Sequence, residues 1–293
     1  MRHLVLLSLL LAVGAYAQEA DTLTAADGWR TDLVASLTGN QAAFSNWQEG
    51  GVDAIAATAA LDGHFDRVVG PFLTQQRVRL AYGVLRQDTL DVRKATDVAR
   101  YEFRAEVPSD ELVRPAASFS ARTQFTPGFD YSPTAEEYPS LTVVPGQELK
   151  VSGPFSPLVM NQSLGVVLRP GGGLVVRGGL GLKETVVVLE RLRPVYGNAP
   201  DSLVRIESGL DGEITFERKV MENVTYKTRL MAFQGFNGFG GDAPDAMFEN
   251  VLLLTVNDLL DVRLDVDTVY DADVSEDVQV REVLSVGVSV DLL

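Results

Sequence analysis

Cysteine is absent from all 293 residues. This excludes disulfides, thiolate metal sites and a lipoprotein anchor. Beyond the N-terminal leader no stretch of about 18 consecutive apolar residues occurs, so a transmembrane helix is excluded, and helical periodicity is nearly absent. The net charge of −15 disfavours nucleic acid as a partner. What remains is a chain built almost entirely from strand-like segments.

The N-terminus has the pattern of a secretory signal peptide. Arg2 and His3 precede the apolar run Leu4–Val13, and Ala15-Tyr16-Ala17 forms a cleavage motif. We predict a signal peptide over 1–17, cut between Ala17 and Gln18; a retained interfacial anchor is the alternative. A short periplasmic segment over 18–28 and a single barrel domain over 29–293 are then expected.

Apolar and polar residues alternate along most of the remaining chain. Near the C-terminus Leu284, Val286, Val288, Val290 and Leu292 share one face, whereas Ser285, Gly287, Ser289 and Asp291 share the other. Strand side chains alternate between faces, so each such segment needs one apolar and one polar environment. Twelve segments have this character, at about 29–39, 52–67, 72–85, 96–107, 112–126, 157–170, 173–183, 204–218, 221–235, 246–257, 259–270 and 277–292.

Short and long connections between these segments also alternate. Short ones fall, for example, at 68–71 and 170–172, and long ones at 40–51, 127–156 and 271–276. Tight turns at one end and longer loops at the other are typical of outer-membrane barrels. We therefore predict an all-β fold, a closed antiparallel up-and-down transmembrane β-barrel of about 12 strands. Ten or fourteen strands, or a soluble β-protein, are the alternatives.

Several short motifs resemble one protein family. They are Ser45-Asn46-Trp47-Gln48-Glu49-Gly50-Gly51, Phe125-Thr126-Pro127-Gly128-Phe129, Val151-Ser152-Gly153-Pro154-Phe155-Ser156-Pro157, Glu222-Asn223-Val224 and Tyr270-Asp271-Ala272-Asp273. In this order they resemble an uncharacterised outer-membrane barrel family, domain-of-unknown-function family 3078. The resemblance implies an envelope barrel, assigns no catalytic residues, and marks Asn46, Trp47, Gly50 and Gly51 as an outer-loop motif. The chain departs from many such barrels by ending in Asp291-Leu292-Leu293 rather than an aromatic residue.

The polar faces of the strands are rich in charge. Bases and acids occur there in nearly equal number, and charges in a confined lumen need partners or water. We expect a salt-bridged network that narrows the lumen. Its candidate members are Arg77, Arg79, Arg100, Arg104, Glu207, Glu213, Lys227, Arg229, Asp261, Arg263 and Asp265.

Few residues offer catalytic or metal chemistry. His64, the single histidine after the leader, lies between Asp62 and Asp66 on the inner face, and a hydrogen-bonded lumen histidine is favoured over a serine hydrolase. Asp271–Asp277 spaces oxygen ligands like the start of a calcium loop but lacks its glycine and closing glutamate, which favours a solvated loop. We expect no catalytic residue, cofactor or metal.

A narrow passive channel for small solutes is the leading functional prediction. The alternatives are a structural or loop-mediated binding barrel without conduction and, less favoured, a barrel hydrolase. The expected location is the outer membrane of a Gram-negative bacterium. The expected partners are outer-membrane lipid, the barrel-assembly machinery and small solutes.

Overall fold

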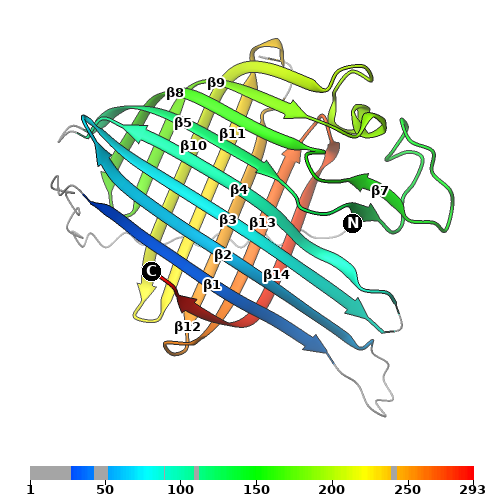
Figure 1. The fold of residues 1–293 in the computed structure, drawn as a ribbon, viewed down its shortest axis with the longest axis horizontal. Helices are drawn as coiled ribbons and strands as arrows, with labels where there is room; N and C mark the ends of the chain where they lie inside the picture. Colours follow the sequence, from blue (N-terminus) through cyan, green and yellow to red (C-terminus); the bar gives the residue numbers. More distant parts are fainter. Residues whose placement is uncertain (1–27, 43–51, 89, 109–111, 239–242) are drawn as a thin grey trace, which may run out of the picture.

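The computed structural model describes residues 28–42, 52–88, 90–108, 112–238 and 243–293. Twelve antiparallel strands close into one barrel, and β1 pairs with β14 to complete the wall (Figure 1). The barrel strands are β1 (Trp29–Ala42), β2 (Ala54–Val69), β3 (Phe72–Gln87), β4 (Arg93–Glu106), β5 (Val113–Thr123), β8 (Leu158–Gly171), β9 (Leu174–Val186), β10 (Val204–Met221), β11 (Val224–Gly235), β12 (Asp245–Thr255), β13 (Leu260–Asp271) and β14 (Ser275–Asp291). The predicted fold class and strand number are confirmed.

The order of strands around the wall follows the chain. The one interruption is that β8 pairs with β5, because β6 (Gly128–Asp130) and β7 (Leu149–Ser152) form a separate small sheet. The described turns between β2 and β3, β8 and β9, and β10 and β11 are tight. The connections 124–157 and 187–203 extend from the opposite end of the barrel, which we call the long-loop end (Figure 1).

These two long connections pack on each other. They hold β6, β7 and the short 3-10 helices η1 (Glu190–Leu192) and η2 (Pro194–Tyr196), and a third such helix, η3 (Phe236–Gly238), follows β11. The Tyr196 hydroxyl donates to the Val151 carbonyl at 2.9 Å, and Leu192 is fully buried. The sequence pattern missed these elements because they are too short to show a period.

One predicted loop is wrong. The segment 271–276 was expected to be a long connection, but β13 runs to Asp271 and β14 begins at Ser275, which leaves a turn over 272–274. The Asp271 side chain accepts the Asp273 amide at 3.0 Å, a bond that lets aspartate close a tight turn. Local backbone capping therefore replaces the solvated loop expected from the acidic composition.

Apolar side chains cover the outside of the barrel. Leu164, Leu180 and Leu210 are register neighbours on β8, β9 and β10, and 71%, 64% and 43% of their surfaces are exposed. On β14 the predicted alternation is confirmed: Leu284 is exposed, whereas Ser285 is buried. An apolar exterior with polar side chains inside is the arrangement of a barrel surrounded by lipid.

A glycine pair lets two strands approach closely inside the wall. Gly165 on β8 and Gly179 on β9 are register partners. A Cβ atom on Gly179 would lie 2.3 Å from the Leu164 carbonyl oxygen, and one on Gly165 would lie 2.1 Å from the Gly178 oxygen. Only glycine fits where two backbones approach this closely.

Among the described residues, no helix is long and apolar enough to cross a membrane.

Candidate functional site

An ion pair spans the lumen from one wall to the other. Arg100 projects from β4 and Glu249 from β12, and these strands lie six positions apart in either direction around the barrel. Two Arg100 guanidinium nitrogens donate to the two Glu249 carboxylate oxygens, at 2.7 and 3.0 Å. This bidentate geometry is the strongest form of arginine–carboxylate contact. The pair therefore ties opposite walls together across the bore.

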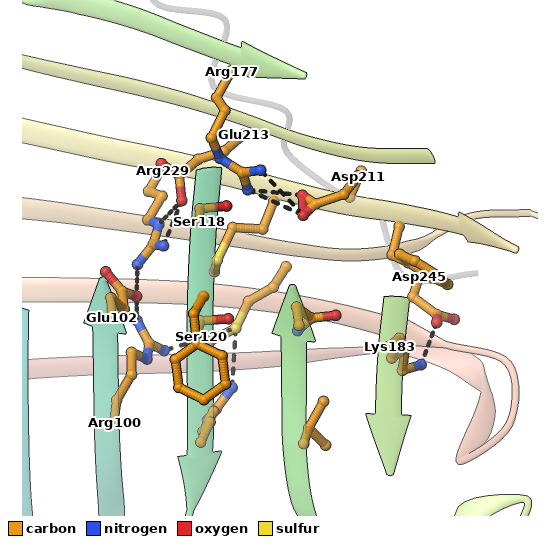
Figure 2. A pocket seen from close by; sticks show the side chains of 18 of the residues that line it. Arg100, Glu102, Ser118, Ser120, Arg177, Lys183, Asp211, Glu213, Arg229 and Asp245 are labelled. Atoms are coloured by element: carbon orange, nitrogen blue, oxygen red, sulfur yellow. Dashed lines mark hydrogen bonds and ion pairs between the residues drawn. The ribbon is translucent and has the colours of Figure 1, made fainter. Parts of the chain in front are cut away.

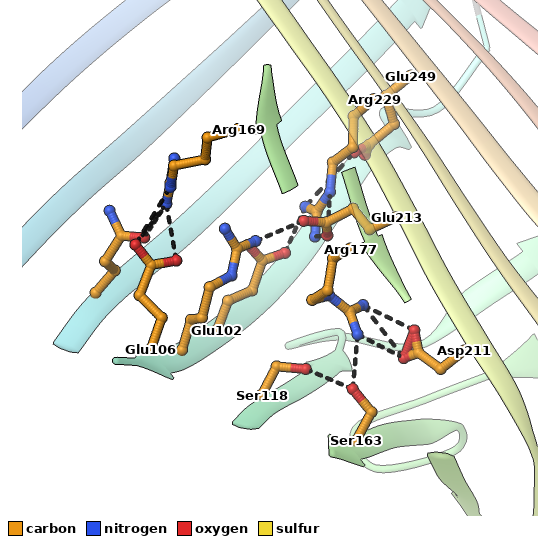
Figure 3. Close-up of polar contacts among 12 residues, drawn as sticks. Glu102, Glu106, Ser118, Ser163, Arg169, Arg177, Asp211, Glu213, Arg229 and Glu249 are labelled. Carbon is orange, nitrogen blue, oxygen red and sulfur yellow. Dashed lines mark hydrogen bonds and ion pairs between the residues drawn. The ribbon is translucent and has the colours of Figure 1, made fainter. Parts of the chain in front are cut away.

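Arg229 on β11 connects this pair to a wider network. Its guanidinium lies 2.5 Å from both Glu102 and Glu213 (Figures 2 and 3), and Arg104 lies 2.7 Å from Glu213. The side chains are largely buried; Glu213 is only 5% exposed. Buried charges are tolerated only when they are paired, and removing one partner of such a pair commonly costs about 3–5 kcal/mol. We call Arg100, Glu102, Arg104, Glu213, Arg229 and Glu249 the lumen bridge.

The lumen bridge separates two cavities. The outer cavity, of about 250 Å³, lies towards the long-loop end of β8 to β13. The inner cavity, of about 600 Å³, follows β1, β2, β3 and β14 and the opposite ends of β9 to β13. Arg100, Glu102 and Arg229 line both cavities. Arg77, Arg122 and Met247 also line both cavities, so in the described part of the chain the two spaces meet at side chains, those of the lumen bridge among them.

A second charged cluster lies at the long-loop end. Lys183 on β9 lies 2.5 Å from Asp245 (Figure 2) and 3.7 Å from Asp271, and Arg205 lies 2.5 Å from Asp273. The three carboxylates offer oxygens that lie within 4.8 Å of one another. Burial raises the pKa of Asp273, but its hydrogen bond and ion pair with Arg205 outweigh burial and hold the pKa below the ordinary value. Lys183 and Arg205 therefore pair with these carboxylates, two of which, Asp271 and Asp273, belong to the segment Asp271–Asp277 for which calcium was considered.

The opposite end of the lumen holds a third cluster. Glu106 is completely buried and accepts from Arg169 at 3.0 Å, with Arg114 at 3.5 Å (Figure 3). A separate bidentate pair joins Arg177 to Asp211, at 2.7 Å for the shorter contact, and Arg177 also donates to Ser163 at 2.6 Å. Paired charge is therefore present along the full depth of the lumen.

The structure places every predicted member of the charge network on the lumen side but divides them among several groups. Arg100, Arg104, Glu213 and Arg229 meet in the lumen bridge. The others pair nearer the wall, as in these contacts: Lys227 with Glu217 at 2.8 Å, Arg79 with Asp62 at 3.4 Å, Arg263 with Asp265 at 2.7 Å, Asp261 with the Ser289 hydroxyl at 2.5 Å, and Glu207 with Arg205 at 3.1 Å. Arg77 lines both cavities.

The predicted network does not include several charged residues of these groups, among them Arg169, Arg177, Lys183, Asp245 and Glu249. Arg169, Arg177 and Lys183 lie on β8 and β9, whose long apolar and glycine-rich runs carry few charges. Glu249 lies on β12, where the run Val251–Leu254 is apolar on both faces and hides the alternation. Glu249 shares a face with Val251 and Leu253, and Asn250 shares the other face with Leu252 and Leu254, so the sequence does not decide which face is inside.

The remaining candidates acquire no catalytic partner. His64 faces Asp32 and Arg77 across its two neighbouring strands, and no hydroxyl in the described part of the chain hydrogen-bonds it. Ser289, on the polar face of β14, donates to Asp261. The cleavage site Ala17–Gln18 and the outer-loop motif Asn46, Trp47, Gly50 and Gly51 lie outside the described residues.

Comparison with solved structures finds other barrels at low identity. The translocator domain of autotransporter NalP from Neisseria meningitidis is 10% identical, with 90% of this chain and 88% of that chain covered and a TM-score of 0.38. An outer membrane channel from Pseudomonas putida F1 is 9% identical, with coverages of 94% and 98% and a TM-score of 0.39. OmpF from Salmonella typhi is 9% identical, with coverages of 90% and 97% and a TM-score of 0.33.

A comparison with curated proteins found no match. The sequence profile of one family does match, over residues 39–129, and this family is described as "Protein of unknown function (DUF3078)". The matched part runs from the end of β1 to β6 and contains the Asn46-Trp47 loop motif. The short motifs led us to expect a resemblance to this family, and the profile match over residues 39–129 agrees with that expectation.

Proposed function

We propose that this protein is an outer-membrane barrel that forms a narrow, low-conductance channel for small solutes. The observation that carries the proposal is the meeting of two lumen cavities at the lumen bridge, where Arg100, Glu102 and Arg229 line both cavities. A lumen divided by side chains can open when those side chains move, because rotamer changes are fast and need no rearrangement of the wall. In a barrel of about eight strands side chains fill the interior, whereas a barrel of about 16–18 strands leaves a wide channel. Twelve strands lie between these two cases.

The outside of the barrel supports the membrane location. Exposed leucine, isoleucine and valine side chains continue around the wall, as on β9, β10 and β14. In water such an apolar surface would drive aggregation, whereas in a bilayer it is solvated by lipid. Fractionation tests the location: the protein should appear with outer membranes and resist carbonate extraction. Recovery in the soluble periplasmic fraction would contradict it.

A barrel without conduction is the second candidate. The diametric pair Arg100–Glu249 favours it, because a bidentate ion pair between opposite walls resists opening. Reconstitution of the purified barrel in planar bilayers separates the candidates. Small, reproducible current steps support the narrow channel, and a silent bilayer with verified insertion supports the non-conducting barrel.

A further inference from the structure

Three arginines occupy one level of the lumen wall. Arg100 on β4 is the direct register partner of Arg79 on β3 and of Arg122 on β5. Like charges placed directly opposite on neighbouring strands destabilise a sheet. Asp62 compensates Arg79 and Glu249 compensates Arg100. This row therefore concentrates positive charge at the level of the lumen bridge.

Arg122 differs from its two neighbours in the row. In the part of the chain that the structure describes, no carboxylate lies within ion-pair distance of it, and its guanidinium donates to the Met247 sulfur at 3.0 Å. A thioether is a weak acceptor, so this contact leaves most of the donor capacity of the guanidinium unused. Arg122 is also exposed to the lumen. An arginine with this much free capacity is suited to bind an anion.

Apolar side chains line the part of the outer cavity beside Arg122, although charged side chains line much of the rest. Val159, Met231, Phe233 and Met247 contribute to the outer cavity together with Arg122. The other charges of its wall are mostly held by partners, as in the pairs Arg177–Asp211 and Lys183–Asp245. Methionine side chains adapt their shape to irregular apolar groups. This part of the cavity thus combines apolar side chains with a cation that has no carboxylate partner among the described residues.

We propose that the outer cavity binds small organic anions with an apolar body, held by a carboxylate or sulfonate on Arg122. The planar guanidinium can donate two parallel hydrogen bonds to such a group. The apolar body would pack against Met231, Phe233 and Met247. At about 250 Å³ the cavity lies just below the about 300–1,000 Å³ of drug-sized sites, which limits the ligand to a compact one. This inference deepens the proposed function, because it names the solute class of that lumen.

Binding can be measured without conduction. The purified barrel in lipid nanodiscs is titrated by calorimetry with 2-naphthoate, with its neutral analogue 2-naphthamide, and with acetate. We expect saturable binding of 2-naphthoate and much weaker binding of both others. Equal binding of 2-naphthamide would overturn the anion site, equal binding of acetate would overturn the apolar part, and absence of 2-naphthoate binding would overturn the whole inference.

Variants then assign the site to Arg122. In Arg122→Gln the Kd for 2-naphthoate should rise by about tenfold or more, as expected for a lost charged hydrogen bond. Arg122→Lys should retain part of the affinity. Arg79→Gln is the matched control, because Arg79 shares the row but lines only the inner cavity. Equal weakening in Arg79→Gln would show a general effect of lumen charge and overturn the assignment. If the protein binds 2-naphthoate but passes no current in a planar bilayer, the proposed channel function is rejected and the proposed binding site stands.

Discussion

Arg100 and Glu249 form a bidentate ion pair across the full width of the barrel, with nitrogen–oxygen distances of 2.7 and 3.0 Å. They lie on β4 and β12, on opposite sides of the wall. Arg229–Glu102 and Arg104–Glu213 also cross the bore, between strands five and four positions apart, whereas several other ion pairs join neighbouring strands; Arg281 and Asp267, for example, are register partners on β14 and β13 at 2.6 Å. A pair along the wall leaves the bore free, whereas a pair across it obstructs the bore. The account of a constricted lumen depends on this difference.

The first prediction concerns the lipid-facing wall. Leu180→Lys, near the middle of β9, should lower the free energy of unfolding by about 2–4 kcal/mol if it lies at the bilayer midplane. A charged side chain there replaces lipid contact with an unsolvated ammonium. Reversible denaturant unfolding in lipid vesicles measures the change. Thr215→Lys on β10 is the control, because Thr215 lines the inner cavity and its side chain can reach water. Equal losses for both variants would refute the assignment of faces.

The second prediction concerns the close approach of β8 and β9. Gly179→Ala should destabilise the barrel by about 1–3 kcal/mol, because the added methyl group overlaps the Leu164 carbonyl and the strands must separate. Gly178→Ala is a matched control, since the nearest atom to its added Cβ is the Asp211 oxygen at 4.0 Å. Thermal unfolding of both variants, followed by heat-modified migration on gels, provides the measurement. A tolerated Gly179→Ala would mean that the two backbones are further apart than described.

The third prediction concerns pH at the long-loop end. Arg205 holds the pKa of Asp273 below its ordinary value despite the opposing effect of burial. A carboxylate with a lowered folded-state pKa stabilises the fold above its unfolded pKa, and this contribution disappears as the pH falls through the folded pKa. Wild type should therefore exceed Asp273→Asn in unfolding free energy at neutral pH, by no more than about 1 kcal/mol because the pair is partly exposed.

The same comparison at acid pH tests the sign. The difference between wild type and Asp273→Asn should shrink once the pH falls below the ordinary carboxylate range. Asp201→Asn offers a control on an exposed carboxylate near the start of β10. A difference that grows as the pH falls would contradict the ion pair with Arg205.

Much of the wall could be predicted from the sequence because one physical rule governs it. Each strand must present apolar side chains to lipid and polar ones to the lumen, so alternation marks both the strand and its faces, as Leu284 and Ser285 show. Alternation is a weak signal where both faces of a strand are apolar, and Glu249 on β12 was therefore missed. It is silent on short loop elements such as β6 and β7.

The partners within the lumen could be predicted only for neighbouring strands. Lys227 and Glu217 pair at 2.8 Å between β11 and β10, as adjacency in the chain suggests. Arg100 and Glu249 meet because the closed twelve-stranded barrel places β4 opposite β12. No local sequence pattern encodes the distance between these two strands. Arg122 is one of many bases on the polar faces of the strands, and the sequence does not set it apart from them. Its lack of a carboxylate partner depends on where all the other side chains go.

Single-channel conductance in planar bilayers tests the central claim most directly. The double variant Arg100→Ala/Glu249→Ala removes both charges of the cross-lumen pair, and Arg281→Ala/Asp267→Ala removes a pair along the wall, so the net charge is unchanged in each. We predict a low, weakly selective conductance for wild type, a clearly larger one for Arg100→Ala/Glu249→Ala, and a near wild-type value for Arg281→Ala/Asp267→Ala. Large wild-type currents, or equal conductance of the two double variants, would contradict the constriction by the lumen bridge.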